Sequence, residues 1–271
     1  AYEMQRSLVD SEMCIRDRIM SANPKDITDE KAFTTYRPGH ADYAGSIKYN
    51  HEDLRNILER SSARKTAIEV AVGAVAKQIL KEFDIKGHSN ILRIGNGRTE
   101  EEFKQEIDQA KEAGDTVGGK IEVIYENLPV GLGSFVQWDR KIDGKIAQAV
   151  MSIPAVKSVA VGNHHAYKMK GSEFHDEMYA KDGKIYRKTN NAGGVEGGMT
   201  NGENLVVTAV MKPIPTLRKP LNTVDAVTME ETEAHFERSD TCAVEACAVV
   251  AEARIACVLA DEFLNKYGGD S

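Results

Sequence analysis

The chain has 271 residues, of which 41% are hydrophobic and 28% charged, and its formal net charge is −7 at pH 7. This composition is typical of a globular protein that buries a core without disulfides or metals. The negative charge argues against non-specific nucleic-acid binding, and no apolar run reaches the length of a membrane span. The four cysteines form no CxxC pair and have no partnered histidine spacing, so we expect no metal site and a reducing, cytoplasmic location.

Residues 1–18 look foreign to the rest of the chain. The stretch “SLVDSEMCIRDR”, residues 7–18, resembles the translation of a sequencing adapter, and its charges break any signal-peptide core. We expect 1–18 to be a non-native leader that contributes nothing to stability. We expect 19–271 to be one domain whose first part is missing.

The segment “TTYRPGHADYAG”, residues 34–45, sets Arg37, His40 and Asp42 around a Pro-Gly pair. That pair disfavours a regular helix or a central strand. We therefore expect Arg37 and His40 on a shaped loop. The alternative is an ordinary surface turn, because Pro-Gly is a strong turn signal.

Helix and strand patterns follow along the chain. In 62–83, apolar residues recur at three- and four-residue spacing and predict a helix with one apolar face: Ile68, Val72, Val75, Ile79 and Leu80. In 99–115, Thr99 is a predicted N-cap and Gly114 a predicted stop. The other predicted elements are helices at 53–60, 141–153 and 244–267, strands at 89–97, 119–129, 155–162 and 204–212, and an extended segment at 213–220. Without strict alternation, this mixture favours an α+β layered domain over a doubly wound parallel sheet.

Arg60, Ser61, Ser62 and Arg64 lie at a junction before the helix predicted at 62–83. Hydroxyls, guanidinium groups and the N–H groups of a helix N-terminus together suit an anion site. The alternative is a plain serine N-cap with exposed arginines.

Residues 163–203 form a polar stretch that is too long for a simple connection, so it is either functional or partly mobile. Its Gly-rich part, continuing to residue 204, lacks the patterns of nucleotide-binding loops. The glycines either let backbone approach a ligand or form a mobile surface loop. His164 and His165 lack a cysteine or carboxylate at ligand spacing, which favours surface residues over metal ligands.

Three further features stand outside these stretches. Lys212 lies beside the rigid proline segment of “MKPIPT”. Asp240, in “ERSDTC”, is a natural N-cap for the last predicted helix. Trp138 and Tyr125 are expected to serve packing.

Taken together, five blocks resemble the chorismate synthase family, in that family's order and spacing. They are “YRPGHADYAGSIKYNHEDLRNILERSSARKTA” (36–67), “LPVGLGSFVQWDRKIDGKIAQAVMSIPAVKSVAVG” (128–162), “NAGGVEGGMTNGE” (191–203), “MKPIPTL” (211–217) and “ERSDTCAV” (237–244). The pattern Glu59-x-x-Ser62-Ala63-Arg64-x-Thr66 is highly specific. The resemblance runs from about Ile19 to near the C-terminus.

The resemblance implies a β-α-β sandwich, assembled as a homotetramer. It also implies a carbon–oxygen lyase of the shikimate pathway, which requires reduced FMN (FMNH2), with NADPH as a candidate reductant of the flavin. The reaction is an anti-1,4 elimination of phosphate from 5-enolpyruvylshikimate 3-phosphate, which gives chorismate with no net redox change.

By the same resemblance, His40 matches a catalytic histidine thought to protonate the reduced flavin, a role that suits a pKa near the working pH. Asp240 matches a carboxylate near the reactive nitrogen of the flavin, a candidate for relaying the substrate proton. Arg37 and Arg64 match substrate-binding arginines, and guanidinium groups suit a polyanion. The implied FMN contacts are Arg60, Ser61, Ser62, Pro154, Ala155, Gly197, Lys212, Pro213, Ile214, Pro215, Thr216 and Arg238.

The chain also departs from the family pattern. The Gly-Glu-Ser-His-Gly block with the first catalytic histidine is absent, as is the arginine-rich segment after it. Ser134 and Glu245 replace residues that are common in the family. We therefore expect a fragment that lacks the N-terminal part and is inactive or nearly so alone. The alternative is a non-catalytic flavin- or phosphate-binding module derived from the same fold.

Overall fold

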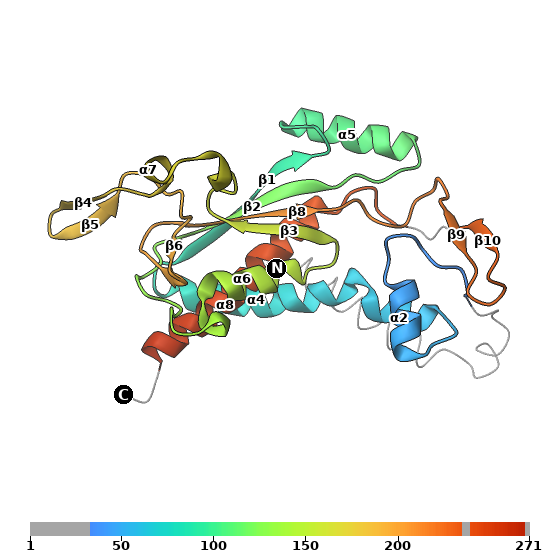
Figure 1. The fold of residues 1–271 in the computed structure, drawn as a ribbon, viewed down its shortest axis with the longest axis horizontal. Helices are drawn as coiled ribbons and strands as arrows, with labels where there is room; N and C mark the ends of the chain where they lie inside the picture. Colours follow the sequence, from blue (N-terminus) through green and yellow to red (C-terminus); the bar gives the residue numbers. More distant parts are fainter. Residues whose placement is uncertain (1–32, 235–238, 269–271) are drawn as a thin grey trace. The chain divides into compact units, whose positions relative to one another are not determined.

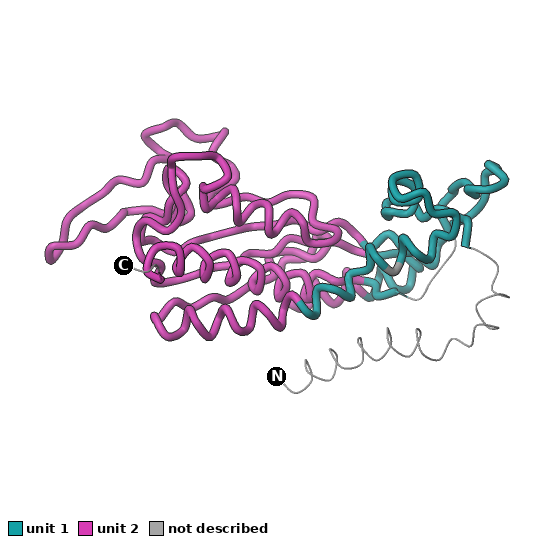
Figure 2. Tube along the Cα trace, turned by 90° about the horizontal axis from the view of Figure 1, so that it is seen from below, with its two compact units in different colours: residues 1–68, 108–116, 214–241 teal, residues 69–107, 117–213, 242–271 magenta. Residues whose placement is uncertain are grey.

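The computed structural model describes residues 33–234 and 239–268. The chain divides into two compact units, which Figure 2 shows in different colours. Unit 1 comprises residues 1–68, 108–116 and 214–241, and unit 2 comprises residues 69–107, 117–213 and 242–271. The leader predicted at 1–18 lies outside the described residues.

Unit 2 is built on a four-stranded antiparallel sheet with the strand order β1-β2-β8-β3. Its strands are β1 (Lys86–Ile94), β2 (Gly119–Glu126), β3 (Val156–Val161) and β8 (Leu205–Met211). Alternate side chains of the central strands are buried, among them Ile121, Val123 and Val207. This is the period-two pattern of a sheet with one face against a core, and it confirms the four strands that the sequence predicts.

Helices α4 (Thr66–Lys81), α6 (Ile142–Met151) and α8 (Val244–Tyr267) lie on one side of this sheet (Figure 1). The long helix α8 packs against β1, β2 and α6. Tyr125 of β2 is 1% exposed, and its hydroxyl donates a 2.8 Å hydrogen bond to the carbonyl oxygen of Glu252 in α8. The expected α+β class and the packing role of Tyr125 are confirmed.

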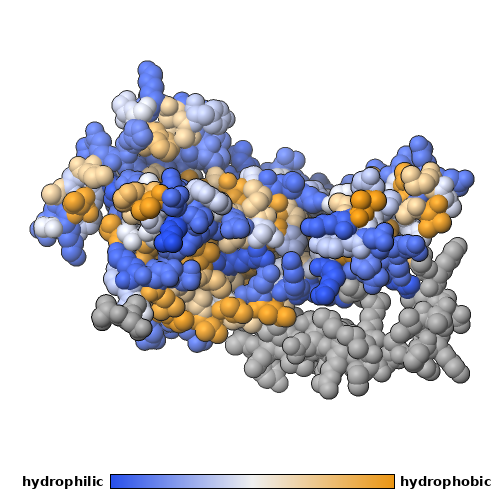
Figure 3. All heavy atoms as spheres, turned by 60° about the horizontal axis from the view of Figure 1, so that its bottom comes forward, coloured by the Kyte–Doolittle hydropathy of each residue, from blue (hydrophilic) through white to orange (hydrophobic). Residues whose placement is uncertain are grey.

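Most of the apolar face predicted for α4 is exposed, and of its residues only Leu80 is buried. Val72, Val75 and Ile79 are 57%, 58% and 36% exposed, whereas Gly73, Ala76 and Leu80 are the buried residues of the helix. The small residues face α8 because two helices approach closely only where side chains are small. Figure 3 shows apolar side chains gathered on the face that these helices form.

Several further elements complete the structure, most of them in unit 2. Helix α5 (Glu100–Glu112) begins at a capping box between Thr99 and Glu102 and ends before Gly114, as predicted. Trp138 lies in η2 (Trp138–Arg140) and is 82% exposed, so the packing role expected for it is wrong. The other elements are η3 (Ala166–Lys168), α7 (Gly171–Phe174), β4 (Met178–Lys181), β5 (Lys184–Arg187), β6 (Val195–Glu196) and β7 (Met199–Thr200).

The long polar stretch is held by a buried carboxylate. Asp176 accepts hydrogen bonds from the hydroxyl of Thr189 and from the backbone N–H groups of Asn191 and Ala192, at 2.5 to 2.9 Å. Burial alone would raise the pKa of Asp176, but these hydrogen bonds and the charge of Arg187 outweigh it and hold that pKa below its ordinary value. The stretch is thus an ordered structure with its own polar anchor.

Unit 1 contains the helices α2 (Asp42–Tyr49) and α3 (Arg55–Ser61), the turn η1 (Ala63–Lys65) and a hairpin of β9 (Asn222–Val224) and β10 (Glu231–Glu233). Helix α2 packs against α3, where a Cβ on Gly45 would lie 2.6 Å from the Ile57 side chain. Neither α2 nor the hairpin is predicted from the sequence. Across the described ranges, no helix is long and apolar enough to cross a membrane.

Candidate functional site

Arg37, His40 and Asp42 form a compact cluster in unit 1. Asp42 is fully buried, and Arg37 is 6% exposed. The Asp42 Oδ2 atom accepts hydrogen bonds from Arg37 Nε at 2.8 Å and from the Arg37 backbone N–H at 3.1 Å. The Asp42 Oδ1 atom accepts one from Arg37 Nη2 at 2.9 Å and lies 2.6 Å from His40 Nδ1. The predicted loop is confirmed, and it winds around a single carboxylate.

The electrostatics of this cluster favour an ionised carboxylate. Burial by itself would raise the pKa of Asp42. The hydrogen bonds and charges of Arg37 and His40 outweigh burial and hold that pKa well below its ordinary value of 3.8. Two cationic or proton-bearing side chains therefore share one buried anion.

The junction of Arg60, Ser61, Ser62 and Arg64 also lies in unit 1. Helix α3 ends at Ser61, and Ser62 adopts an extended conformation before η1. The Ser62 hydroxyl accepts a 3.3 Å hydrogen bond from the Arg64 backbone N–H, which makes Ser62 the N-cap of η1. Arg60 and Arg64 are exposed. The expected break before α4 is confirmed. Its local structure is a serine N-cap with exposed arginines, which the sequence offered as the alternative to an anion site.

Ala155 and Lys212 lie together in unit 2. The Lys212 backbone N–H donates a 2.9 Å hydrogen bond to the Ala155 carbonyl oxygen. Ala155 has a φ of +70°, in the left-handed region that non-glycine residues rarely adopt. Burial, followed by the charge of Lys157, lowers the pKa of Lys212. Such backbone strain and a perturbed lysine are features that cluster at functional sites.

Gly197, Pro154 and Pro213 are the other described candidates in unit 2. Gly197 has a φ of +61° between β6 and β7, and nothing lies within 4 Å of the position a Cβ would take. Pro154 is half-buried and precedes the strained Ala155, and Pro213 is exposed. Gly197 therefore combines a left-handed conformation with open space beside its backbone.

The remaining candidates come from residues 214–240 in unit 1. Thr216 is 8% exposed, and its carbonyl oxygen accepts a 2.9 Å hydrogen bond from the Ser239 hydroxyl, which brings Asp240 into the same neighbourhood. Helix α8 begins at Val244 with Ala243 as N-cap, so Asp240 is not its N-cap. Ile214 and Pro215 are half-buried, and Arg238 lies outside the described residues.

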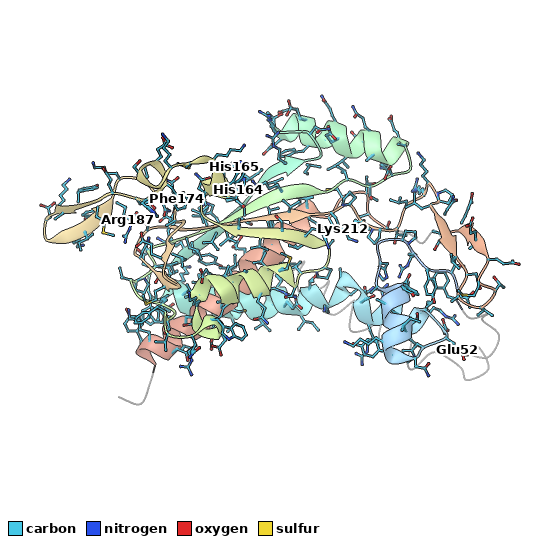
Figure 4. All side chains as sticks on the ribbon, viewed as in Figure 1. Glu52, His164, His165, Phe174, Arg187 and Lys212 are labelled. Atoms are coloured by element: carbon cyan, nitrogen blue, oxygen red, sulfur yellow. The ribbon has the colours of Figure 1, made fainter. Side chains whose placement is uncertain are left out.

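His164 and His165 lie side by side beyond β3, far along the ribbon from the end of β8 that carries Lys212 (Figure 4). Their ring centroids are 4.0 Å apart, both side chains are exposed, and His164 Nε2 lies 3.0 Å from Lys120 Nζ. Burial and the Lys120 charge lower the pKa of His164. Within the described ranges, no group of histidine, cysteine, aspartate and glutamate residues could hold a metal ion.

Sequence reasoning assigned no role to Asp42, although the structure places it at the centre of the cluster. The available signal was its spacing, because Asp42 follows His40 by two residues and begins an eight-residue helix. The first turn of a helix favours an acidic side chain. The position of Asp42 in a first helical turn could not be recognised from the sequence, because α2 itself was not predicted.

A sequence model of the chorismate synthase family matches residues 13–264. The chain is 58% identical over 240 residues to the chorismate synthase of Thermoanaerobacter pseudethanolicus, and the match covers 88% of this chain and 69% of that protein. It is 50% identical over 287 residues to the chorismate synthase of Geobacter sulfurreducens, covering 93% and 73% respectively. A solved chain described as “Crystal Structure of Chorismate Synthase” superposes with a TM-score of 0.73 at 44% identity, covering 85% of this chain and 72% of that one.

Proposed function

The chain belongs to the chorismate synthase family, and we propose that its described clusters serve the elimination of phosphate from 5-enolpyruvylshikimate 3-phosphate with reduced FMN bound. The reaction removes one ring proton and one phosphate group, and it leaves chorismate without net oxidation or reduction. The observation that carries this proposal is the buried cluster of Arg37, His40 and Asp42. The curated relatives are enzymes, and nothing supports the non-catalytic alternative.

Features of unit 2 fit a flavin nucleotide. Ala155 and Gly197 both adopt left-handed conformations, and Gly197 has open space where a side chain would stand. Lys212, whose backbone N–H is hydrogen-bonded to Ala155, carries a cation suited to a phosphate group. Within unit 1, Arg60, Ser61 and Ser62 present a cation and two hydroxyls, groups that also suit a phosphate. When bound, reduced FMN supplies electron density that assists the departure of phosphate.

The side chains of this chain have separable tasks in the proposal. Arg64 binds the polyanionic substrate through charge-assisted hydrogen bonds, and Arg37 holds the cluster that orients His40. His40 gains or releases a proton at Nε2, which suits an imidazole at neutral pH. Asp240 is proposed to accept the substrate proton.

An anaerobic assay tests the proposal. The chain, extended at its N-terminus with the Gly-Glu-Ser-His-Gly block and the arginine-rich segment of the family, is used here and in every turnover measurement below. It is mixed with 5-enolpyruvylshikimate 3-phosphate and chemically reduced FMN, and chorismate and inorganic phosphate are measured together. We expect equal amounts of both products, with none when FMN is omitted. In a parallel FMN titration, Arg60→Ala should weaken binding, whereas Arg98→Ala, at an exposed position in unit 2, should not. Phosphate release without chorismate, or product without flavin, would contradict the proposal.

The family also supports proposals on reductant, assembly and location. We propose that NADPH serves as a reductant of the flavin, that the protein forms a homotetramer and that it works in the cytoplasm. Light scattering behind size-exclusion chromatography measures the assembly directly. A monomer across a hundredfold range of concentration would contradict the tetramer.

A further inference from the structure

The Asp42 carboxylate is surrounded by hydrogen-bond donors from residues 37–40. Arg37 contributes Nε, Nη2 and the backbone N–H, and His40 contributes Nδ1. The side chain of Asp42 is 0% exposed, while that of His40 is 17% exposed. One end of the His40 ring thus faces a buried anion, and the side chain keeps a small exposed fraction.

The geometry fixes where the proton of neutral His40 lies. Arg37 and His40 hold the pKa of Asp42 well below its ordinary value against the effect of burial, so the carboxylate is ionised and has no proton to donate. A 2.6 Å contact between Asp42 Oδ1 and His40 Nδ1 therefore requires a proton on Nδ1. In the neutral ring this leaves the lone pair on Nε2.

Arg37 also lies close to the His40 ring, and its contacts are compatible with this assignment. Its Nη2 atom lies 2.9 Å from His40 Nδ1 and 3.4 Å from His40 Nε2, and a guanidinium can only donate. Since the Nδ1 proton is directed at Asp42, Nδ1 has no lone pair to offer Arg37. Arg37 is instead bound by two parallel hydrogen bonds to the two Asp42 oxygens, the rigid geometry typical of an arginine–carboxylate pair.

We infer that Asp42 is a positioning residue, which holds His40 in the Nδ1–H tautomer and aligns its ring so that Nε2 is the nitrogen that exchanges a proton. This inference rests on the proposed role of His40. A buried carboxylate that orients an imidazole is a recurring device, because the wrong tautomer presents a proton where a lone pair is needed. Asp42 itself touches no substrate in this account and acts through His40.

Nitrogen NMR of the whole chain tests the inference. The chain is labelled with ¹⁵N-histidine, His40 is assigned by its loss in His40→Gln, and two-bond proton–nitrogen spectra are recorded at pH 8. We expect the shift of a protonated Nδ1 and of an unprotonated Nε2 in the parent chain. A protonated Nε2 in the parent overturns the inference without any variant.

Asp42→Asn removes the charge with little change of shape. We expect the two nitrogen shifts of His40 to converge as both tautomers become populated, and kcat to fall about 10–100-fold with a smaller change in KM. Asp53→Asn is the matched control, because Asp53 also binds a nearby arginine, Arg55, in unit 1. It should leave the His40 shifts and kcat unchanged. Unchanged His40 shifts in folded Asp42→Asn would overturn the inference, whereas normal turnover by His40→Gln would instead refute the proposed function and leave the tautomer assignment standing.

Discussion

Gly73 of α4 packs directly against Ala253 of α8. A Cβ added to Gly73 would lie 2.4 Å from the Ala253 Cβ and 2.8 Å from the Ala253 carbonyl oxygen. Separations under 3 Å require backbone to move, because Ala253 has no flexible side chain to displace. The helix crossing therefore depends on the absence of one methyl group.

We expect Gly73→Ala to lower the free energy of unfolding by about 1–3 kcal/mol through overpacking. Alanine is intrinsically better than glycine in a helix by about 1 kcal/mol. A lower free energy of unfolding in Gly73→Ala would therefore have to come from the steric contact with Ala253. Gly144→Ala in α6 is the matched control, since its nearest neighbour would be the Trp138 carbonyl oxygen at 3.5 Å. That change should be stabilising. Urea unfolding measures both, and equal gains for the two variants would refute the packing argument.

Asp176 anchors the stretch 163–203, so Asp176→Ala should loosen it. Three hydrogen bonds to a carboxylate are lost, and each is worth about 1.5–3 kcal/mol when the acceptor is charged. We expect limited proteolysis within this stretch to become at least about tenfold faster. Glu177→Ala is the control, because Glu177 and Lys188 form an exposed ion pair that contributes little. Equal cleavage rates in both variants would show that Asp176 is not the anchor.

The spacing of apolar residues in the sequence predicted the strands and helices that form the core of unit 2. The strands of the sheet, α6 and the exact bounds of α8 follow from apolar patterns, since burial selects those patterns. The pattern of α4 misled for a physical reason. Its most apolar residues, such as Val72 and Val75, are exposed, while the buried contact is made by Gly73. Composition alone does not distinguish an apolar face from a packed one.

The site was predictable only in part. The loop of Arg37 and His40 and the break at Ser62 follow from turn residues. The central place of Asp42 does not, because it depends on four donors converging on one buried carboxylate. Sequence spacing predicts that Arg37, His40 and Asp42 lie close together. Only the folded structure shows that Asp42 is buried and is the shared hydrogen-bond acceptor.

His40→Ala should lower turnover more than it weakens flavin binding. The proposed task of His40 is proton transfer, and a positioned acid or base contributes about 10²–10⁴-fold. Turnover with reduced FMN and the FMN dissociation constant are measured on the same preparation. His51→Ala, at an exposed position in unit 1, controls for the loss of an imidazole. Intact turnover in His40→Ala would remove the residue from the proposed mechanism.

Arg64→Ala should weaken substrate binding by about tenfold to a hundredfold, the equivalent of one charge-assisted hydrogen bond of about 1.5–3 kcal/mol. Arg64→Lys should recover part of this loss, since an ammonium keeps the charge but not the planar two-point contact. Calorimetric titration with 5-enolpyruvylshikimate 3-phosphate measures each dissociation constant. Lys65→Ala, the exposed neighbour, should bind like the parent. Parent-like affinity in Arg64→Lys would show that planarity plays no part.

Asp42 predicts a specific loss of stability in acid. Its pKa in the folded chain lies below the ordinary value of 3.8, so the unfolded chain binds more protons as the pH falls. The stabilisation is therefore complete above about pH 5 and declines as the pH falls through 4 toward the folded-state pKa. Arg37 and His40 are the side chains that face this carboxylate, and neither loses a hydrogen-bond donor as the solution acidifies.

Urea unfolding of the parent and of Asp42→Asn at pH 6 and at pH 3 isolates the effect. At pH 6 the variant should be less stable by about 3–5 kcal/mol, the usual result of removing one partner of a buried ion pair. At pH 3 that difference should shrink, whereas Asp182→Asn, at an exposed turn, should track the parent at both values. A difference that stays constant from pH 6 to pH 3 would mean that the Asp42 carboxylate is not the anion on which this cluster depends.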